Sequence, residues 1–410
     1  MHIAIVDGYS TGAALARQLY ALGVTCTHVQ SQPQANEHLR RSFDAATYLA
    51  NLGYDPDLQM VADRLTTLGV SRITAGAESG VTLAEQLSLH LGLPTNSAEH
   101  LAARRDKRLM GQAVAASGLA TPRTHVARTP TAGRRWFEAS GLPEAVVKPL
   151  ASAGSDNVWF CRTAADVEAA CASVLAAPTI FGEPNRAALV QERLVGSEYY
   201  INTVSHDGHH RVAEIWRYTK QVSPVSTPVY DYEEPVEATT QEARTLRRFT
   251  FAVLDALGIK SSPAHTEVML TARGPVLIET GARLGGATAP DVVERYCGVS
   301  QTSLAAAALV DPQNLLDFDD TQTTWTGAVR HVEFVNHRQG QADANAAQKV
   351  AELPSAVAVG SAVDPGELIA PTGSLLSSPG YAYLAADDRD AVERDYARLR
   401  EWERQGLHTV

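Results

Sequence analysis

Short apolar runs alternate with helical patterns over the first hundred residues. Residues 2–7 form an apolar run rich in β-branched side chains, which predicts a buried strand. A helical pattern follows, and the four-residue spacing of Leu83, Leu87 and Leu91 predicts a further amphipathic helix. Alternating strands and helices usually form a parallel sheet. Residues 1–98 are therefore expected to form an N-terminal Rossmann-like domain of the α/β class.

The pattern changes after about residue 136, where paired strands replace this alternation. Asp207-Gly208 stands between two strand-like segments and is a strong signal for a β-hairpin. Residues 218–240 contain three prolines and few helix formers, so they are expected to form a long loop. The expected organisation after the first domain is a linker helix over 99–135, a small lid over 136–196, an α+β catalytic part with a large antiparallel sheet over 197–334, and a C-terminal lobe over 335–410.

Composition and charge exclude several classes of protein. The chain has 410 residues, of which 45% are hydrophobic and 20% charged, so chain-wide disorder is excluded. No apolar run approaches the roughly 20 residues that cross a membrane. The net charge is −11 and no dense run of Lys or Arg occurs, which argues against a nucleic-acid partner. Four cysteines without a CxxC pair, and a first segment unlike a signal peptide, predict a cytoplasmic protein.

Two glutamates are predicted to face each other across a hairpin. Residues 265–270 and 276–279 are strand-like, and a hairpin centred on Arg273 places Glu267 directly opposite Glu279. Two carboxylates so close repel each other unless a cation lies between them, and Mg²⁺ commonly binds carboxylate together with phosphate oxygens. The pair therefore indicates a Mg²⁺–nucleotide site. On the pair alone, an exposed hairpin with two solvated glutamates explains the pattern equally well.

Basic residues and a small-residue loop precede this pair. Lys148 ends an apolar strand-like segment, where a charged side chain is costly unless its charge is used. The loop 151–155 follows it and can bind phosphate through backbone N–H groups. Lys107 stands upstream at the start of a helical pattern. No GxxxxGK[ST] motif is present, so a P-loop fold is not supported.

A basic residue also follows the pair. Arg283 comes four residues after Glu279, in a segment that contains Gly281, Gly285 and Gly286. Its guanidinium could bind a carboxylate or a phosphoryl group through two hydrogen bonds. In isolation, a surface arginine is the alternative explanation.

The order of these elements resembles the ATP-grasp superfamily over about residues 1–335. Within it the chain looks most like the L-amino acid ligases, the group that contains the bacilysin dipeptide synthetase. Many ATP-grasp enzymes have Asn two residues after the second metal-binding Glu, whereas Gly281 occupies that position here, as in the amino acid ligases. The matching segments are Arg105-Asp106-Lys107, Val147-Lys148-Pro149, the loop 151–155, Gln191 through Glu198, His265-Thr266-Glu267 and Glu279 through Arg283.

The resemblance implies a role for each of these residues. It implies that ATP is held by Lys107, Lys148, Ser152, Gly154 and Ser155 at the phosphates, by Gln191, Glu192 and Leu194 at the adenine, and by Glu198 at the ribose. Glu267 and Glu279 would bind Mg²⁺, for which Mn²⁺ can substitute. Arg283 would stabilise the acyl phosphate and the tetrahedral intermediate, and Arg283 and Lys148 are the expected catalytic residues.

The same resemblance implies residues for substrate recognition. Glu78 would bind the substrate's α-amino group, and a helix-start glutamate favoured by the helix dipole is the alternative reading. The ligases carry a His where this chain has the segment 215–218, and a bulky aromatic of some relatives is replaced by Ala287. These departures predict a roomier acceptor pocket. The expected lining residues are Glu78, Trp216, Arg283, Gly285, Gly286 and Ala287.

Together these expectations describe an ATP-dependent carboxylate–amine ligase. ATP would phosphorylate the carboxylate of an amino acid, and the amine of a second amino acid or peptide would then displace phosphate, in natural-product or antibiotic biosynthesis. Two alternatives stay open: a ligase for a carboxylate that is not an amino acid, and a nucleotide-binding protein without catalysis. A biotin-dependent carboxylase fits poorly, because no biotinyl Met-Lys-Met segment is present. A homodimer is expected from the resemblance.

Overall fold

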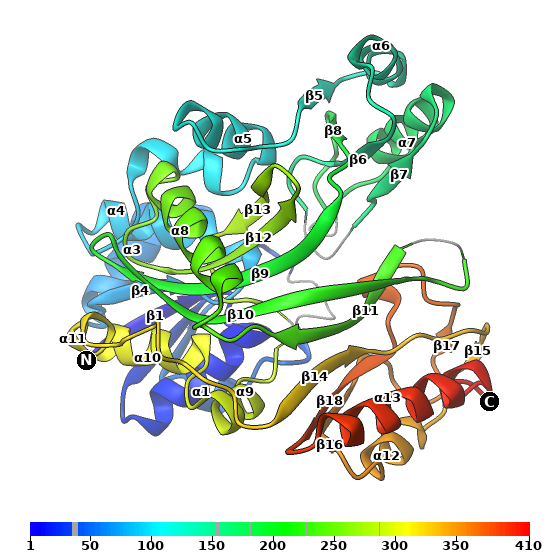
Figure 1. Cartoon of the computed structure of the whole chain (residues 1–410). Coiled ribbons are helices and arrows are strands. Elements are labelled where there is room, and N and C mark those ends of the chain that lie inside the picture. Colours follow the sequence, from blue (N-terminus) through cyan, green and yellow to red (C-terminus); the bar gives the residue numbers. More distant parts are fainter. Residues whose placement is uncertain (35–39, 153–155, 180–181, 226–227, 287) are drawn as a thin grey trace.

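The computed structural model describes residues 1–34, 40–152, 156–179, 182–225, 228–286 and 288–410. Three larger β-sheets and the helices that cover them make up this part of the chain (Figure 1). No described helix is long and apolar enough to span a membrane. The mixed architecture confirms the predicted α/β class with an α+β catalytic part.

The first sheet is parallel, as the alternation of strands and helices predicts. Its strand order is β3-β2-β1-β4, and every neighbouring pair runs parallel. The central strand is buried along its whole length because helices cover both faces of such a sheet. The elements are β1 (His2–Val6), α1 (Thr11–Ala21), β2 (Thr25–Val29), β3 (Ala50–Leu52), α3 (Leu58–Thr67), β4 (Arg72–Ala75) and α4 (Val81–His90).

The second sheet is small and carries two helices. Its strand order is β5-β8-β6-β7, with antiparallel pairing throughout. It extends away from the other sheets in Figure 1 and has a hydrophobic core of its own. Strand β5 lies within the segment 99–135 that was expected as a linker. The elements are β5 (Thr124–Ala127), α6 (Pro130–Ser140), β6 (Ala145–Pro149), β7 (Trp159–Cys161), α7 (Ala164–Ala176) and β8 (Ala188–Glu192).

The third sheet is the large antiparallel sheet that the sequence predicts. Its strand order is β13-β12-β9-β10-β11-β14-β18-β16, so it continues without a break into the expected C-terminal lobe. The strands are β9 (Gly196–His206), β10 (His209–Val222), β11 (Pro228–Pro235), β12 (Pro263–Thr271), β13 (Gly274–Gly281), β14 (Ala328–Glu333), β16 (Ala356–Ser361) and β18 (Gly380–Ala386).

Helices connect and cover this large sheet. Helix α10 packs against α1, so the N-terminal sheet and the large sheet share a hydrophobic core. A two-stranded sheet pairs β15 with β17 beside the C-terminal helices. The remaining elements are α5 (Lys107–Ala116), α8 (Gln241–Ala256), α9 (Pro290–Cys297), α10 (Gln301–Val310), α11 (Gln313–Leu316), α12 (Ala346–Ala351), β15 (Gly340–Gln341), β17 (Leu368–Ile369) and α13 (Arg389–Arg404).

The Asp207-Gly208 hairpin is confirmed. His206 pairs with His209 across the turn, and Asp207 and Gly208 have φ angles of 46° and 79°. Positive φ at both central residues is the requirement of a type I′ turn, which Asp-Gly meets at little cost. The hairpin joins β9 to β10, two neighbouring strands inside the large sheet.

The expected long loop over residues 218–240 is wrong for most of its length. Strand β10 continues to Val222, and β11 occupies Pro228–Pro235. The prolines misled the prediction, because Pro228 and Pro235 stand at the two ends of the strand, where no ladder hydrogen bond is lost. Between them, aromatic and acidic residues alternate, which fits a strand with two different faces. This strand carries Glu233, a residue of the site described below.

Candidate functional site

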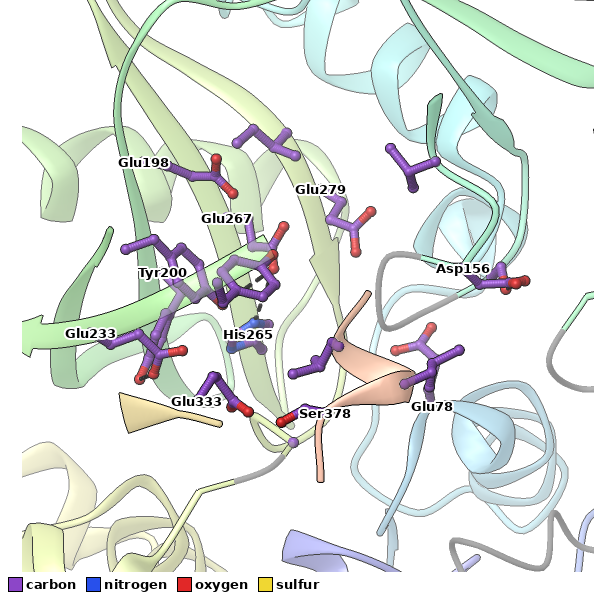
Figure 2. Close-up of a pocket in the computed structure, with 18 of the residues that line it drawn as sticks. Glu78, Asp156, Glu198, Tyr200, Glu233, His265, Glu267, Glu279, Glu333 and Ser378 are labelled. Carbon is purple, nitrogen blue, oxygen red and sulfur yellow. Dashed lines mark hydrogen bonds and ion pairs between the residues drawn. The ribbon is translucent and has the colours of Figure 1, made fainter. Parts of the chain in front are cut away.

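A cavity of about 690 Å³ lies where the N-terminal sheet, the small sheet and the large sheet meet. Figure 2 shows acidic side chains from several elements arranged around it. Most of the residues singled out in the sequence line this cavity although they are far apart along the chain. They are Glu78, Lys107, Lys148, Ser152, Gln191, Glu192, Leu194, Glu198, Glu267, Glu279, Arg283 and Gly286.

The two glutamates expected to bind metal are directly opposed. Glu267 on β12 pairs with Glu279 on β13, as the hairpin centred on Arg273 predicts. Figure 2 shows both side chains directed into the cavity, near Glu198. The carboxylate pair offers the hard oxygen ligands that Mg²⁺ prefers, and lysines stand close enough to share phosphate oxygens with it.

Lys107 connects the start of α5 to this pair. Asp106 caps the helix by accepting hydrogen bonds from the backbone N–H groups of the next turn, so the helix begins at Lys107. The Lys107 ammonium lies 2.9 Å from Glu279 Oε2 and donates to the backbone carbonyl of Ser152 at 2.9 Å. Burial raises the pKa of Glu279, but the charges of Lys107 and Lys148 outweigh burial and hold that pKa well below its ordinary value. Glu279 is therefore an anion at neutral pH.

Lys148 is a buried cation on the small sheet. It lies on β6, between β8 and β7, and only 8% of its surface is exposed. Burial lowers the pKa of Lys148, and the nearby carboxylate of Glu279 opposes this effect. A buried ammonium aimed at a cavity is costly unless an anion meets it, so this position favours an anionic ligand such as phosphate.

The expected nucleotide-base residues lie at the junction of β8 and β9. Gln191 donates a hydrogen bond to Thr124 Oγ1 at 3.1 Å, and Glu192 lies 2.7 Å from Arg273. Glu198 pairs with the Lys220 ammonium at 2.8 Å. Burial raises the pKa of Glu198, while Lys220 acts in the opposite direction. Lys220 was missed in the sequence because the end of β10 was taken for a loop.

Glu78 lies between two arginines on the other side of the cavity. It follows β4 and forms ion pairs with Arg105 and with Arg283, whose Nε is 2.9 Å from Glu78 Oε2. Burial raises the pKa of Glu78, but the two guanidinium groups outweigh burial and lower it. A Cβ atom at Gly281 would lie 2.7 Å from Glu78 Oε2. The absence of a side chain at Gly281 is thus what allows Glu78 to reach Arg283.

The remaining expected residues fall outside the cavity or outside the described residues. Trp216 is 1% exposed and packs in an aromatic core, with ring centroids 6.2 Å from Tyr200 and 5.0 Å from Trp325, so its expected place in the substrate pocket is not observed. Gly285 is not among the described residues that line the cavity. Its backbone N–H donates to Gln301 Oε1 at 2.7 Å. Gly154, Ser155 and Ala287 lie outside the described residues.

Sequence reasoning missed a second group of cavity residues. These residues come from β9, β10, β11, β12 and β14, and the missed strand β11 explains why the group escaped notice. The alternation of aromatic and acidic residues at 230–233 is the signal that could have revealed it. The group consists of Tyr200, Tyr218, Glu233, His265, His331 and Glu333.

Comparisons with known proteins identify the family of the chain. A family model described as the ATP-grasp domain matches residues 143–291. The chain is 31% identical over 415 residues to dapdiamide A synthase from Enterobacter agglomerans, an alignment that covers 99% of this chain and 96% of that protein.

Two solved structures share the fold. The L-amino acid ligase from Bacillus licheniformis has a TM-score of 0.77 and 18% identity, covering 98% of this chain and 97% of that one. Carboxyaminoimidazole ribonucleotide synthase from Aspergillus clavatus, complexed with ATP, has a TM-score of 0.71 and 13% identity, covering 98% of each chain. The match to dapdiamide A synthase extends over nearly the whole chain and therefore shows the family as well as the fold. The chain belongs to the ATP-grasp family and, within it, to the amino acid ligases.

Proposed function

We propose that this protein joins the carboxylate of one amino acid to the amine of a second amino acid or peptide, through an acyl phosphate and with release of ADP and phosphate. The observation that carries the proposal is the meeting of two lysines, an opposed glutamate pair and the Glu78–Arg283 ion pair in one cavity. ATP-grasp structures solved with ATP or ADP support the use of this nucleotide.

The phosphoryl transfer needs positioning and charge more than a protein nucleophile. Lys107 and Lys148 would hold the phosphates, because both ammonium groups lie on the cavity beside Glu279. Glu267 and Glu279 would hold Mg²⁺, which, when bound, offsets the charge of the phosphates. Mn²⁺ would fit the same oxygen ligands. The expected roles of Gln191 and Glu198 at the adenosine part remain predictions.

The acid substrate would be held on the Glu78 side. Arg283 would bind its carboxylate and then stabilise the negative charge that develops on the acyl oxygen during amine attack. Glu78 would accept hydrogen bonds from the α-ammonium group of the same substrate, while its pairing with Arg105 and Arg283 keeps it ionised. Closure of the cavity around the acyl phosphate would limit its hydrolysis.

The name of the Enterobacter agglomerans relative favours a role in natural-product biosynthesis. A ligase for an acid other than an amino acid, and an ATP-binding protein without catalysis, are the competing hypotheses. A cytoplasmic location, a homodimer and the domain boundaries given above remain predictions.

The decisive experiment is phosphate release from ATP and Mg²⁺ with all pairs of the common amino acids, followed by mass spectrometry of each active pair. A product with the summed mass of two amino acids minus water supports the proposal and identifies both substrates. Phosphate release with a single acid and no condensed product would mean that the amine lies outside the panel. ATP binding without turnover across the panel and a wider set of acids would favour the non-catalytic hypothesis.

A further inference from the structure

A second acidic cluster lines the same cavity, away from the glutamate pair. It consists of Glu233 on β11 and of His331 and Glu333 on β14, whose potential ligand atoms all lie within 4.8 Å of one another. All three residues are buried. Figure 2 shows Glu233 and Glu333 on a different side of the cavity from Glu78. The expected metal, nucleotide and acid sites use none of these residues.

The cluster carries more negative than positive charge. His331 Nδ1 lies 2.8 Å from Glu233 Oε2, and His331 Nε2 lies 3.8 Å from Glu333 Oε1. Burial lowers the pKa of His331, but the two carboxylates outweigh burial and raise it. A protonated imidazole between two carboxylates leaves one negative charge in excess. His331 Nε2 is buried and has no hydrogen-bond partner among the described residues.

The neighbouring cation Arg400 does not cancel this excess. Arg400 donates to the backbone carbonyl of Glu333 at 2.9 Å, and its charge is already shared by Asp231 and Glu403. Burial therefore raises the pKa of Glu333 to about 7, although His331 and Arg400 act against this shift. A ligand that supplies a positive charge would therefore stabilise the ionised form of this buried carboxylate.

Aromatic residues connect the cluster to the expected reaction site. The Tyr200 hydroxyl donates to Glu233 at 3.1 Å, and the Tyr200 ring lies 5.2 Å from that of His265. His265 Nε2 in turn lies 3.6 Å from Glu267. The cluster is thus two side chains away from a proposed metal ligand.

A second connection leads to the glycine-rich segment that follows Arg283. His331 stacks on Tyr383 at 4.3 Å between ring centroids. The backbone N–H of Ala289 donates to the Tyr383 hydroxyl at 3.2 Å. The cluster is therefore linked through Tyr383 to the segment that follows Arg283, the expected substrate-binding residue.

We propose that the Glu233–His331–Glu333 cluster binds the ammonium nitrogen of the amine substrate before attack on the acyl phosphate, an inference that rests on the proposed function. An amine is a monovalent cation at neutral pH, which matches the single excess negative charge of the cluster with Glu333 ionised. Its three N–H groups suit carboxylate oxygens that lie close together. Glu78 and the cluster would then hold the two amino groups of the reaction on separate sides of one cavity.

Hydroxylamine offers a way to separate the two half-reactions, because it is largely uncharged at pH 7.5 and traps acyl phosphates as hydroxamates. The variant Glu333→Gln removes one charge and keeps the shape of the side chain. We expect its KM for the amine substrate to rise at least tenfold, while hydroxamate formation from acid, ATP and hydroxylamine stays within about twofold of wild type. Glu233→Gln should act in the same direction.

Glu393→Gln is the matched control. Glu393 lies 2.9 Å from Arg330, the neighbour of His331 on β14, but its side chain is 57% exposed and it is not among the described cavity residues. This variant should leave both half-reactions unchanged. Thermal unfolding of all three variants will show whether any effect reflects loss of folding. If Glu333→Gln fails to fold, the comparison rests on Glu233→Gln.

Several outcomes would overturn the inference. An unchanged KM for the amine, or an equal loss of hydroxamate and condensed product, would show that the cluster does not serve the amine. Loss confined to amines with a cationic side chain would mean that the cluster reads the side chain instead. One bound Mn²⁺ ion fewer in Glu333→Gln than in wild type, by equilibrium dialysis without nucleotide, would identify a metal site.

Failure of the proposed function is a separate result, seen as neither hydroxamate nor condensed product from the wild-type protein with any acid. The inference is then tested by calorimetric binding of L-leucinamide and L-alaninamide, which carry an ammonium group but no carboxylate to activate. Binding that is at least tenfold weaker in Glu333→Gln than in wild type would support the cluster. Equal binding, or no binding to wild type, would overturn it.

Discussion

Glu267 and Glu279 face each other because Ile278 is left unpaired between their strands. Val268 pairs with Leu277, whereas the next pair is Glu267 with Glu279, so β13 has one extra residue at Ile278. Without this bulge Glu267 would oppose Ile278, and Glu279 would point to the other face of the sheet. The bulge thus brings two carboxylates onto one face, next to Lys107. Repulsion between them is relieved only by cations.

Replacing Glu279 with Gln tests the proposed metal site. We expect Glu279→Gln to lower ADP release at saturating substrates by about 100-fold or more, because part of the electrostatic stabilisation of phosphoryl transfer is lost. Lys107 loses its partner in the same variant, so the Mg²⁺ dependence must be measured as well as the rate. A higher Mg²⁺ requirement would attribute the loss to the metal. Full ADP release at ordinary Mg²⁺ would show that the metal assignment is wrong.

Two glutamate–arginine pairs near the N-terminal sheet should respond differently to the same change. Glu78 faces the cavity, whereas Glu85 is bound by Arg104 at 2.7 Å with both side chains buried. We expect Glu78→Gln to raise the KM for the acid substrate by roughly 10- to 100-fold, since one charged hydrogen bond is worth about 1.5–3 kcal/mol. Its thermal unfolding should change little.

Glu85→Gln should lower the stability of the protein and leave the KM for the acid substrate unchanged. Breaking a buried ion pair by neutralising one partner costs about 3–5 kcal/mol, so the free energy of unfolding should fall while the KM of the folded fraction stays near wild type. Steady-state kinetics and urea unfolding of both variants make the comparison. Similar behaviour of the two would mean that Glu78 is structural.

Substitutions of Trp216 test whether this residue belongs to the core or to the substrate pocket. Because it is buried among Tyr200, Trp325 and Tyr383, Trp216→Ala should lower the free energy of unfolding by about 3–5 kcal/mol. Trp216→Phe keeps most of the contacts and should cost less, with little effect on the KM of either substrate. A large increase in KM in a well-folded Trp216→Phe protein would show that Trp216 contributes to the substrate pocket.

Glu214 makes stability depend on pH. Burial raises the pKa of Glu214 from its ordinary value of 4.5 to about 7, although Asn202 donates a hydrogen bond to it at 2.8 Å. The folded protein therefore binds a proton that the unfolded chain releases between these two pH values, and stability is lost as pH rises through this window. Glu214→Gln should raise the free energy of unfolding at pH 8 by up to about 3 kcal/mol.

This gain should fade toward pH 4.5, where the wild-type carboxyl is protonated in both states. Urea unfolding of wild type and Glu214→Gln at pH 5, 6, 7 and 8 provides the measurement. A stability difference that does not change with pH would contradict the assignment of a raised pKa to this residue.

The sequence alone determined the parallel sheet and the Asp207-Gly208 hairpin, and it also predicted the opposition of Glu267 to Glu279. Each depends on a local pattern, either the period of apolar residues or the demands of a tight turn. The prediction for the glutamates assumed a hairpin symmetric about Arg273. The strands reach that register at Glu267 only because of the extra residue at Ile278. Tight-turn chemistry sets the hairpin, but a bulge is decided by packing.

The tertiary structure decided which residues share the cavity and which enter the core. Trp216 and Tyr218 lie on the same strand two positions apart, yet only Tyr218 lines the cavity, because the curvature and neighbours of a strand differ along its length. Glu233 and His331 are 98 residues apart and meet only because β11 pairs with β14. Contacts of this range depend on strand order, which no local pattern in the chain encodes.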